Sequence, residues 1–102
     1  MSRSVYIIKD SHSRYKIGIS VNPRKRLKQL QTGAGCQLEL VDSHVCDNVH
    51  KVEKGLHFRY SFFHDFGEWY NLPQSYLSEF HDMCNTIDNN INILKNSSND
   101  YV

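Results

Sequence analysis

The segments that decide the fold are Val5-Tyr6-Ile7-Ile8-Lys9 and Tyr15-Lys16-Ile17-Gly18-Ile19-Ser20, separated by a polar segment at 10–14. Both segments are rich in β-branched and aromatic residues and the polar segment is turn-like, so together they predict a β-hairpin. If Lys9 opposes Tyr15, the face expected in the core carries Val5, Ile7, Ile17 and Ile19. The other face carries Tyr6 and Lys16, and Gly18 lies opposite Tyr6 and leaves room for its ring.

A helix is expected directly after the hairpin. Asn22-Pro23 combines an N-cap residue with a proline at the first helical position. Leu27 and Leu30 give this helix an inward side, and Gly33 is expected to cap its C-terminus.

Residues 38–42 predict a third strand that can extend to Val45, and Asp47 or Asn48 then caps a second helix. The apolar stripe of this helix consists of Val49, Val52, Leu56 and Phe63. A second stripe, a quarter-turn away, consists of His50, Glu53, His57 and His64. This polar stripe either lines a cleft or is a solvated edge with ordinary surface histidines, and the residues alone favour the solvated edge.

The C-terminal part predicts a turn and a short extended piece over 67–73, then a last amphipathic helix. Trp69 and Tyr70 are interpreted as core anchors, and no role follows for Glu68. The pattern as a whole predicts an α/β sandwich, in which helices flank a small three-stranded antiparallel sheet. One domain is expected over 1–95, with a frayed or disordered tail at 96–102.

The composition of the 102 residues, 39% hydrophobic and 23% charged, fits one globular domain. No apolar run approaches the roughly 18 residues of a membrane helix, and no signal peptide is expected at the N-terminus. Cys36, Cys46 and Cys84 form no C-x-x-C pair, so we expect free thiols in a reducing compartment, the cytoplasm or nucleus. Zinc bound by Cys36, Cys46 and His50 is not expected, because their spacing matches no common structural site.

Charge is distributed unevenly along the chain, although the formal net charge is only +1. Residues 1–34 carry a net charge of +7, and residues 64–102 carry a net charge of −5. The basic front half is either an electrostatic footprint for a polyanion or one of two halves that neutralise each other in the fold. Charge alone leaves both interpretations open.

Several of these segments together resemble the GIY-YIG nuclease superfamily, in its phage-type branch that is also named for a meiotically up-regulated gene. The resemblance covers residues 5 to 72. It is carried, in order, by 5–8, 15–20, 22–33, Glu53 with Leu56-His57, and 67–70. It implies a three-stranded antiparallel sheet with surrounding helices and a metal-dependent endonuclease that hydrolyses phosphodiester bonds, with DNA preferred to RNA.

The resemblance also implies the residues of the site. The expected catalytic residues are Tyr6, Lys16, Arg26, Glu53 and His57. Glu53 is the expected ligand of Mg²⁺ or Mn²⁺, since its carboxylate is a hard oxygen donor. Arg26 would bind phosphate bidentately, and Tyr6 would orient or deprotonate the attacking water. The expected nucleic-acid contacts are Arg14, Arg24, Lys25 and Lys28.

Lys16 departs from the superfamily pattern, because it occupies the place of the tyrosine in the second motif. A protonated lysine cannot accept a proton, but it can stabilise developing negative charge and favour a phenolate at Tyr6. The same change fits a module that binds nucleic acid without cutting it. Leu30 also stands where several relatives carry a histidine.

Two alternatives to an endonuclease therefore stay open. One is a catalytically inactive nucleic-acid-binding module with salt-sensitive affinity. The other is an interaction protein, for instance a virus-encoded inhibitor that acts in a host cell. A domain of this size has little surface for reading a long site, so a homodimer or a larger partner is expected to supply specificity.

Overall fold

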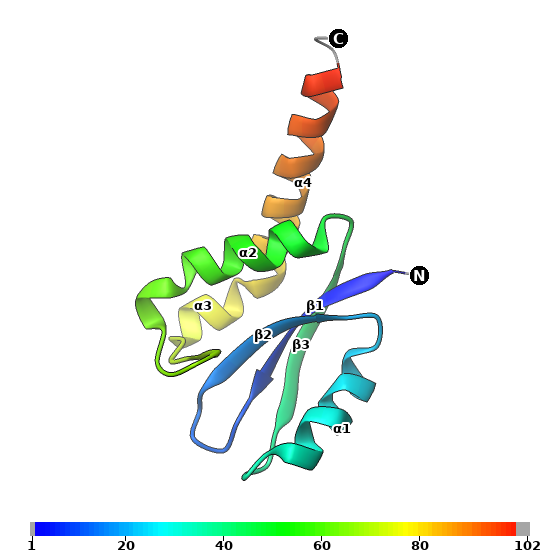
Figure 1. Cartoon of the computed structure of the whole chain (residues 1–102). Coiled ribbons are helices and arrows are strands. Elements are labelled where there is room, and N and C mark those ends of the chain that lie inside the picture. Colours follow the sequence, from blue (N-terminus) through cyan, green and yellow to red (C-terminus); the bar gives the residue numbers. More distant parts are fainter. Residues whose placement is uncertain (1, 100–102) are drawn as a thin grey trace.

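A four-stranded antiparallel sheet forms the centre of the computed structural model, which describes residues 2–99 (Figure 1). The strands lie in the order β3-β1-β2-β4. Their bounds are Arg3–Lys9 for β1, Tyr15–Ser20 for β2, Glu39–Cys46 for β3 and Trp69–Tyr70 for β4. The sequence predicts three strands, and the fourth is the short extended piece, which pairs with the start of β2.

The register of the predicted hairpin is confirmed. Lys9 opposes Tyr15 and Tyr6 opposes Gly18. Strand β3 pairs with the other edge of β1, with an irregularity between Ile7 and Ile8. Strand β4 pairs only with the first two residues of β2, so within the described chain the rest of β2 has an open edge beyond β4.

The sheet separates two apolar clusters, and both of its faces are covered (Figure 1). One face packs against α2 (Val49–Arg59), α3 (Gln74–Ser78) and α4 (Phe80–Asn99). The other face, which carries Tyr6, packs against α1 (Pro23–Gly33). Tyr6 is therefore only 2% exposed. The sequence predicts a core on one face of the hairpin only, whereas the structure buries the second face as well.

Helix α1 begins as predicted, because the Asn22 side chain accepts the Lys25 N–H at 3.2 Å and Pro23 is the first helical residue. The helix has no fully buried residue, and it rests on the sheet through half-buried Leu27 and Leu30. The predicted glycine cap is wrong: the capping position is Ala34, which is extended at φ −85° and ψ 144°. The chain leaves the helix directly into an extended segment and needs no left-handed residue there.

Helix α2 is shorter than predicted, since it ends at Arg59 and a 3₁₀ turn, η1 (Ser61–Phe63), follows it. Its predicted apolar residues Val49, Val52 and Leu56 are buried. Asn48 occupies the N-cap position, but its side chain makes no capping hydrogen bond.

Asp88 on α4 holds the corner between β3 and α2. Its carboxylate accepts the backbone N–H groups of Asp47 at 3.0 Å and Asn48 at 2.8 Å, and the Asn48 side-chain amide at 2.8 Å. Asn48 therefore directs its side chain toward α4, which explains why it does not cap its own helix.

The predicted last helix is two helices, because the chain breaks at Glu79 between α3 and α4. Helix α4 continues over 96–99, where the sequence predicts a tail, and residues 100–102 of that tail lie outside the described residues. Within the described part of the chain, no helix is both long and apolar enough to cross a membrane.

Candidate functional site

Lys16 on β2 forms an ion pair with Glu68, in which Lys16 Nζ lies 2.8 Å from Glu68 Oε2. The hydrogen bond and the charge of Lys16 lower the pKa of Glu68, and the charges of His57 and Arg26 lower it further. Three residues predicted from the sequence, Lys16, His57 and Arg26, therefore lie close enough to one carboxylate to act on it.

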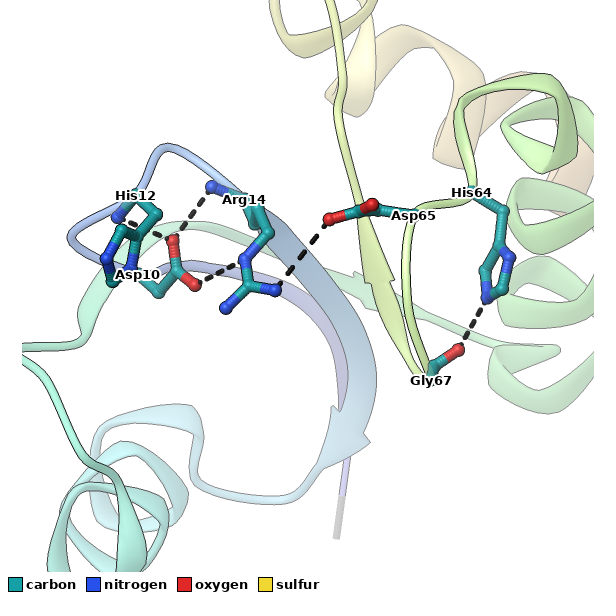
Figure 2. Close-up of polar contacts among 6 residues, drawn as sticks. All are labelled: Asp10, His12, Arg14, His64, Asp65 and Gly67. Carbon is teal, nitrogen blue, oxygen red and sulfur yellow. Dashed lines mark hydrogen bonds and ion pairs between the residues drawn. The ribbon is translucent and has the colours of Figure 1, made fainter.

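The loop before β4 holds Glu68 in place. The His64 ring Nε2 donates to the Gly67 carbonyl at 2.6 Å, and Gly67 adopts a left-handed φ of 57° (Figure 2). The N–H of Trp69 donates to the carbonyl of Phe66 at 2.9 Å. This tight turn places Glu68 beside β2. His64, which lies beyond the end of α2, stabilises this loop.

A second chain of contacts links Tyr70, His57 and Glu53. Tyr70 Oη lies 2.9 Å from His57 Nδ1, and His57 Nε2 lies 4.0 Å from Glu53 Oε2, one turn back on α2. Burial raises the pKa of Tyr70, as do the negative charges of Glu53 and Glu68. The contact of Tyr70 Oη with Nδ1 orients the imidazole ring so that Nε2 is the nitrogen that faces Glu53.

The Tyr6 ring lies against Gly18 on the sheet face that also carries Lys16. A Cβ on residue 18 would come within 2.4 Å of Tyr6 Oη and 2.5 Å of Tyr6 Cζ. The space that the sequence analysis expects opposite Tyr6 is thus occupied by its ring, and only glycine fits at this position.

Arg26 is exposed on α1, where its Nη1 lies 3.4 Å from Gln29 Oε1. It borders a shallow cavity of about 240 Å³ between the end of β2 and α1. Among residues 2–99, no hydrogen bond or ion pair joins Tyr6 or Arg26 directly to Glu53. The geometry therefore gathers Lys16, Glu68, His57, Tyr70 and Glu53 near the β2–β4 edge, while Tyr6 shares the sheet face of Lys16 and Arg26 lies on α1, which covers that face.

The other predicted cations fall into two groups. Arg24, Lys25 and Lys28 are exposed on α1 and form no ion pair among the described residues. Arg14 instead lies between two carboxylates, with its Nε 2.9 Å from Asp10 Oδ2 and its Nη1 3.7 Å from Asp65 Oδ2 (Figure 2). Arg14 therefore joins the hairpin turn to the loop before β4, and its contact with nucleic acid stays a prediction.

Comparison with known proteins identifies the family. The T5orf172 domain matches residues 3–87, which is most of the chain. The chain belongs to the T5orf172 domain family. This phage-associated domain is related to GIY-YIG-like nucleases, and it indicates a nuclease-like or DNA-binding role. No curated protein and no solved structure matches the chain.

The Glu53 carboxylate of this T5orf172 domain fits the divalent cation that the resemblance to GIY-YIG nucleases implies. The Glu53 side chain is 30% exposed, and no hydrogen bond to its carboxylate occurs among residues 2–99. A solvent-accessible carboxylate without such partners is the kind of hard oxygen donor that Mg²⁺ and Mn²⁺ prefer.

Two residues of the T5orf172 site go beyond the sequence analysis. Tyr70 is buried, as expected of a core anchor, but its hydroxyl also holds His57. Glu68 pairs with Lys16, and the signal that points to it is its place in the motif Gly67-Glu68-Trp69-Tyr70. Of the polar stripe predicted on α2, His57 and Glu53 belong to the site, whereas the His50 ring forms a hydrogen bond with Arg3.

Proposed function

We propose that this T5orf172 domain is a metal-dependent endonuclease that hydrolyses DNA phosphodiester bonds. The observation that carries the proposal is that the pair Lys16–Glu68 lies near the chain Tyr70–His57–Glu53, since the Lys16 hydrogen bond and the His57 charge lower the pKa of Glu68, while burial and the Glu68 charge raise the pKa of Tyr70. Hydrolysis of a phosphodiester needs cations for the phosphate and a carboxylate for a metal, and the β2–β4 edge supplies both kinds of group.

Lys16 and Arg26 would bind the phosphate oxygens. Arg26 can form two parallel hydrogen bonds to a phosphate and stays charged at any physiological pH. Lys16 is now paired with Glu68, whose side chain is 72% exposed. Because the Glu68 carboxylate is largely solvated, this ion pair contributes little, and a phosphate can replace the carboxylate at small cost.

Glu53 would hold Mg²⁺ or Mn²⁺, which when bound neutralises charge on the phosphate and on the leaving oxygen. His57 is a positioning residue in this scheme, since Tyr70 holds its Nδ1 and its Nε2 faces the Glu53 carboxylate. Tyr6 would orient the attacking water through its hydroxyl. Because Tyr6 is only 2% exposed, this role requires water to reach its hydroxyl beside Gly18.

The test is nicking of supercoiled plasmid DNA in Mg²⁺, Mn²⁺ or EDTA by the wild type and by Glu53→Gln. Cutting should require the metal, and Glu53→Gln should slow it by about 100-fold or more, since charge stabilisation at the reacting phosphate is lost. Glu39→Gln, an exposed glutamate on β3, is the matched control and should cut as the wild type does. Cutting that persists in Glu53→Gln would overturn the assignment of the site.

A second candidate, a nucleic-acid-binding module without turnover, is favoured by the lysine at position 16 and by its pairing with Glu68. This module would bind DNA in a salt-sensitive manner. Neutralising Arg24, Lys25 or Lys28 would each reduce the salt slope by about 1. Binding without nicking would support this function, whereas absence of DNA binding would favour an interaction protein. For either nucleic-acid function we propose that a homodimer or a larger partner supplies specificity.

A further inference from the structure

We propose that Asp10, His12 and Cys36 form a site for a thiophilic divalent cation such as Zn²⁺. Within residues 2–99, these three side chains form the one group of metal-ligating residues whose ligand atoms all lie within 4.8 Å of one another. The site is separate from Glu53, and it does not depend on the nuclease activity proposed above.

The fold brings these ligands together from two segments. Asp10 and His12 belong to the turn between β1 and β2, and Cys36 lies in the segment between α1 and β3. The Gln31 side chain holds that second segment, since it donates to the Cys36 carbonyl at 2.9 Å and accepts the Leu38 N–H at 2.7 Å. Cys36 is thereby fixed beside the hairpin turn.

The Asp10 carboxylate is buried and oriented by the turn itself. Its Oδ1 accepts the N–H groups of His12 and Arg14, each at 2.9 Å, and its Oδ2 accepts from Arg14 Nε at 2.9 Å (Figure 2). A carboxylate has about four lone-pair positions. Three are used, and the free one belongs to Oδ2.

The charge of Asp10 is also suited to a cation. Burial works to raise its pKa, but hydrogen bonds from Arg14 and His12 and the Arg14 charge outweigh burial, so the pKa lies below the usual value. The carboxyl group is therefore ionised at neutral pH, as a metal ligand must be.

The other two ligands are accessible. His12 is exposed, and its ring makes no hydrogen bond within the described chain, whereas Cys36 is a half-buried free thiol. Zinc bonds of about 2.0–2.3 Å place tetrahedral ligands about 3.3–3.8 Å apart. The ligand atoms lie within 4.8 Å of one another, so closing to these separations needs movements of at most about 1–1.5 Å, which the exposed His12 and half-buried Cys36 side chains can supply.

The donor set decides between metals. A thiolate and an imidazole with one carboxylate favour Zn²⁺, while Mg²⁺ prefers oxygen ligands alone. On binding, the Cys36 thiol releases its proton to solvent, so affinity rises with pH. The negative charges of Asp10 and the Cys36 thiolate then balance the two positive charges of the ion. The occupied site therefore carries no net positive charge that would repel Arg14. The fourth position of a tetrahedral site would be left for water.

Such a site would brace the proposed nucleic-acid surface. Asp10 and Cys36 line a cavity of about 490 Å³ together with Arg14, Lys16 and Trp69. A metal bridge across this cavity would fix the end of α1 relative to the hairpin that carries Lys16.

The experiment is titration of the full, metal-stripped chain with Co²⁺, followed by displacement with Zn²⁺ in competition with a chromophoric chelator. The expected result is one ion per chain and a thiolate-to-cobalt charge-transfer band in the near ultraviolet. Cys36→Ser should abolish that band. Cys36→Ser and His12→Gln should each weaken Zn²⁺ binding by more than about 100-fold, since loss of an outer partner alone costs about 10–100-fold.

His50→Gln removes an exposed histidine outside the cluster and is the matched control, so its band and affinity should match the wild type. Cobalt bound only at the contact between His44 and His81 would show no thiolate band. Absence of the band, its survival in Cys36→Ser, or equal weakening in His50→Gln would each overturn the proposal.

Discussion

Gly18→Ala tests how closely Tyr6 is interlocked with the hairpin. The added Cβ would lie 2.4 Å from Tyr6 Oη and 2.5 Å from Tyr6 Cζ, far inside van der Waals contact. The phenol ring is rigid and only 2% exposed between the sheet and α1, so it has no free space into which it can turn. Overpacking of this kind costs about 1–3 kcal/mol.

Urea denaturation and thermal unfolding measure this cost. At this chain length, a loss of about 2 kcal/mol corresponds to a fall in Tm of about 8–16 °C. Gly33→Ala is the matched control, because Gly33 is the last residue of α1 and a Cβ there meets nothing within 4 Å. It should leave stability unchanged or raise it by up to about 1 kcal/mol.

A double-mutant cycle assigns the cost to Tyr6. In Tyr6→Phe the Cζ contact remains, so Gly18→Ala should still be destabilising. In Tyr6→Leu both close atoms are gone, and Gly18→Ala should cost less than about 0.5 kcal/mol. An equal cost of Gly18→Ala in the wild type and in the Tyr6→Leu variant would refute the steric reasoning, and so would a neutral Gly18→Ala in the wild type.

Four further predictions concern a helix cap and two carboxylates. Asn22→Ala should lower the free energy of unfolding by about 1 kcal/mol in urea, and no change would show that the cap bond is not formed. Asp88→Ala should lower it by about 2–4 kcal/mol, because buried N–H groups, including that of Asn48, lose their acceptor. The hydrogen bonds of Asp88 outweigh burial, so its pKa in the folded protein lies below the usual value of 3.8. The stabilisation by Asp88 is therefore present above pH 3.8 and is lost as the pH falls through the folded pKa. A wild type that keeps its full stability below the folded pKa would contradict the assignment. Carbon-13 NMR should find the Glu68 carboxyl titrating below 4.5 in the wild type and nearer 4.5 in Lys16→Met, whereas identical curves would exclude the ion pair.

The hairpin is predictable because two segments rich in β-branched and aromatic residues flank a short turn-like segment, and its register is predictable because Gly18 leaves room for the Tyr6 ring opposite it. The start of α1 is predictable for a similar local reason, since Asn22 and Pro23 act within a single turn. In both cases the decisive contacts join residues that are close in sequence.

The parts that escape prediction depend on contacts between distant segments. The two residues of β4 form a strand only because β2 offers them an edge, and Glu68 meets Lys16 only when that pairing forms. The link between Asp88 and Asn48 spans 40 residues and replaces the helix cap that local reasoning expects. No periodic pattern signals these contacts, so the candidate site is only partly visible in the sequence.

Helix α1 and the hairpin differ in how freely their residues can change. The helix contributes no fully buried side chain, and substitutions of exposed residues such as Arg24, Lys25 and Lys28 usually change stability by no more than about 0.5 kcal/mol. Tyr6 and Gly18, in contrast, can change only together. Over evolutionary time the positive charge of α1 can therefore change at little cost in stability, whereas Tyr6 and Gly18 in the sheet beneath it constrain each other.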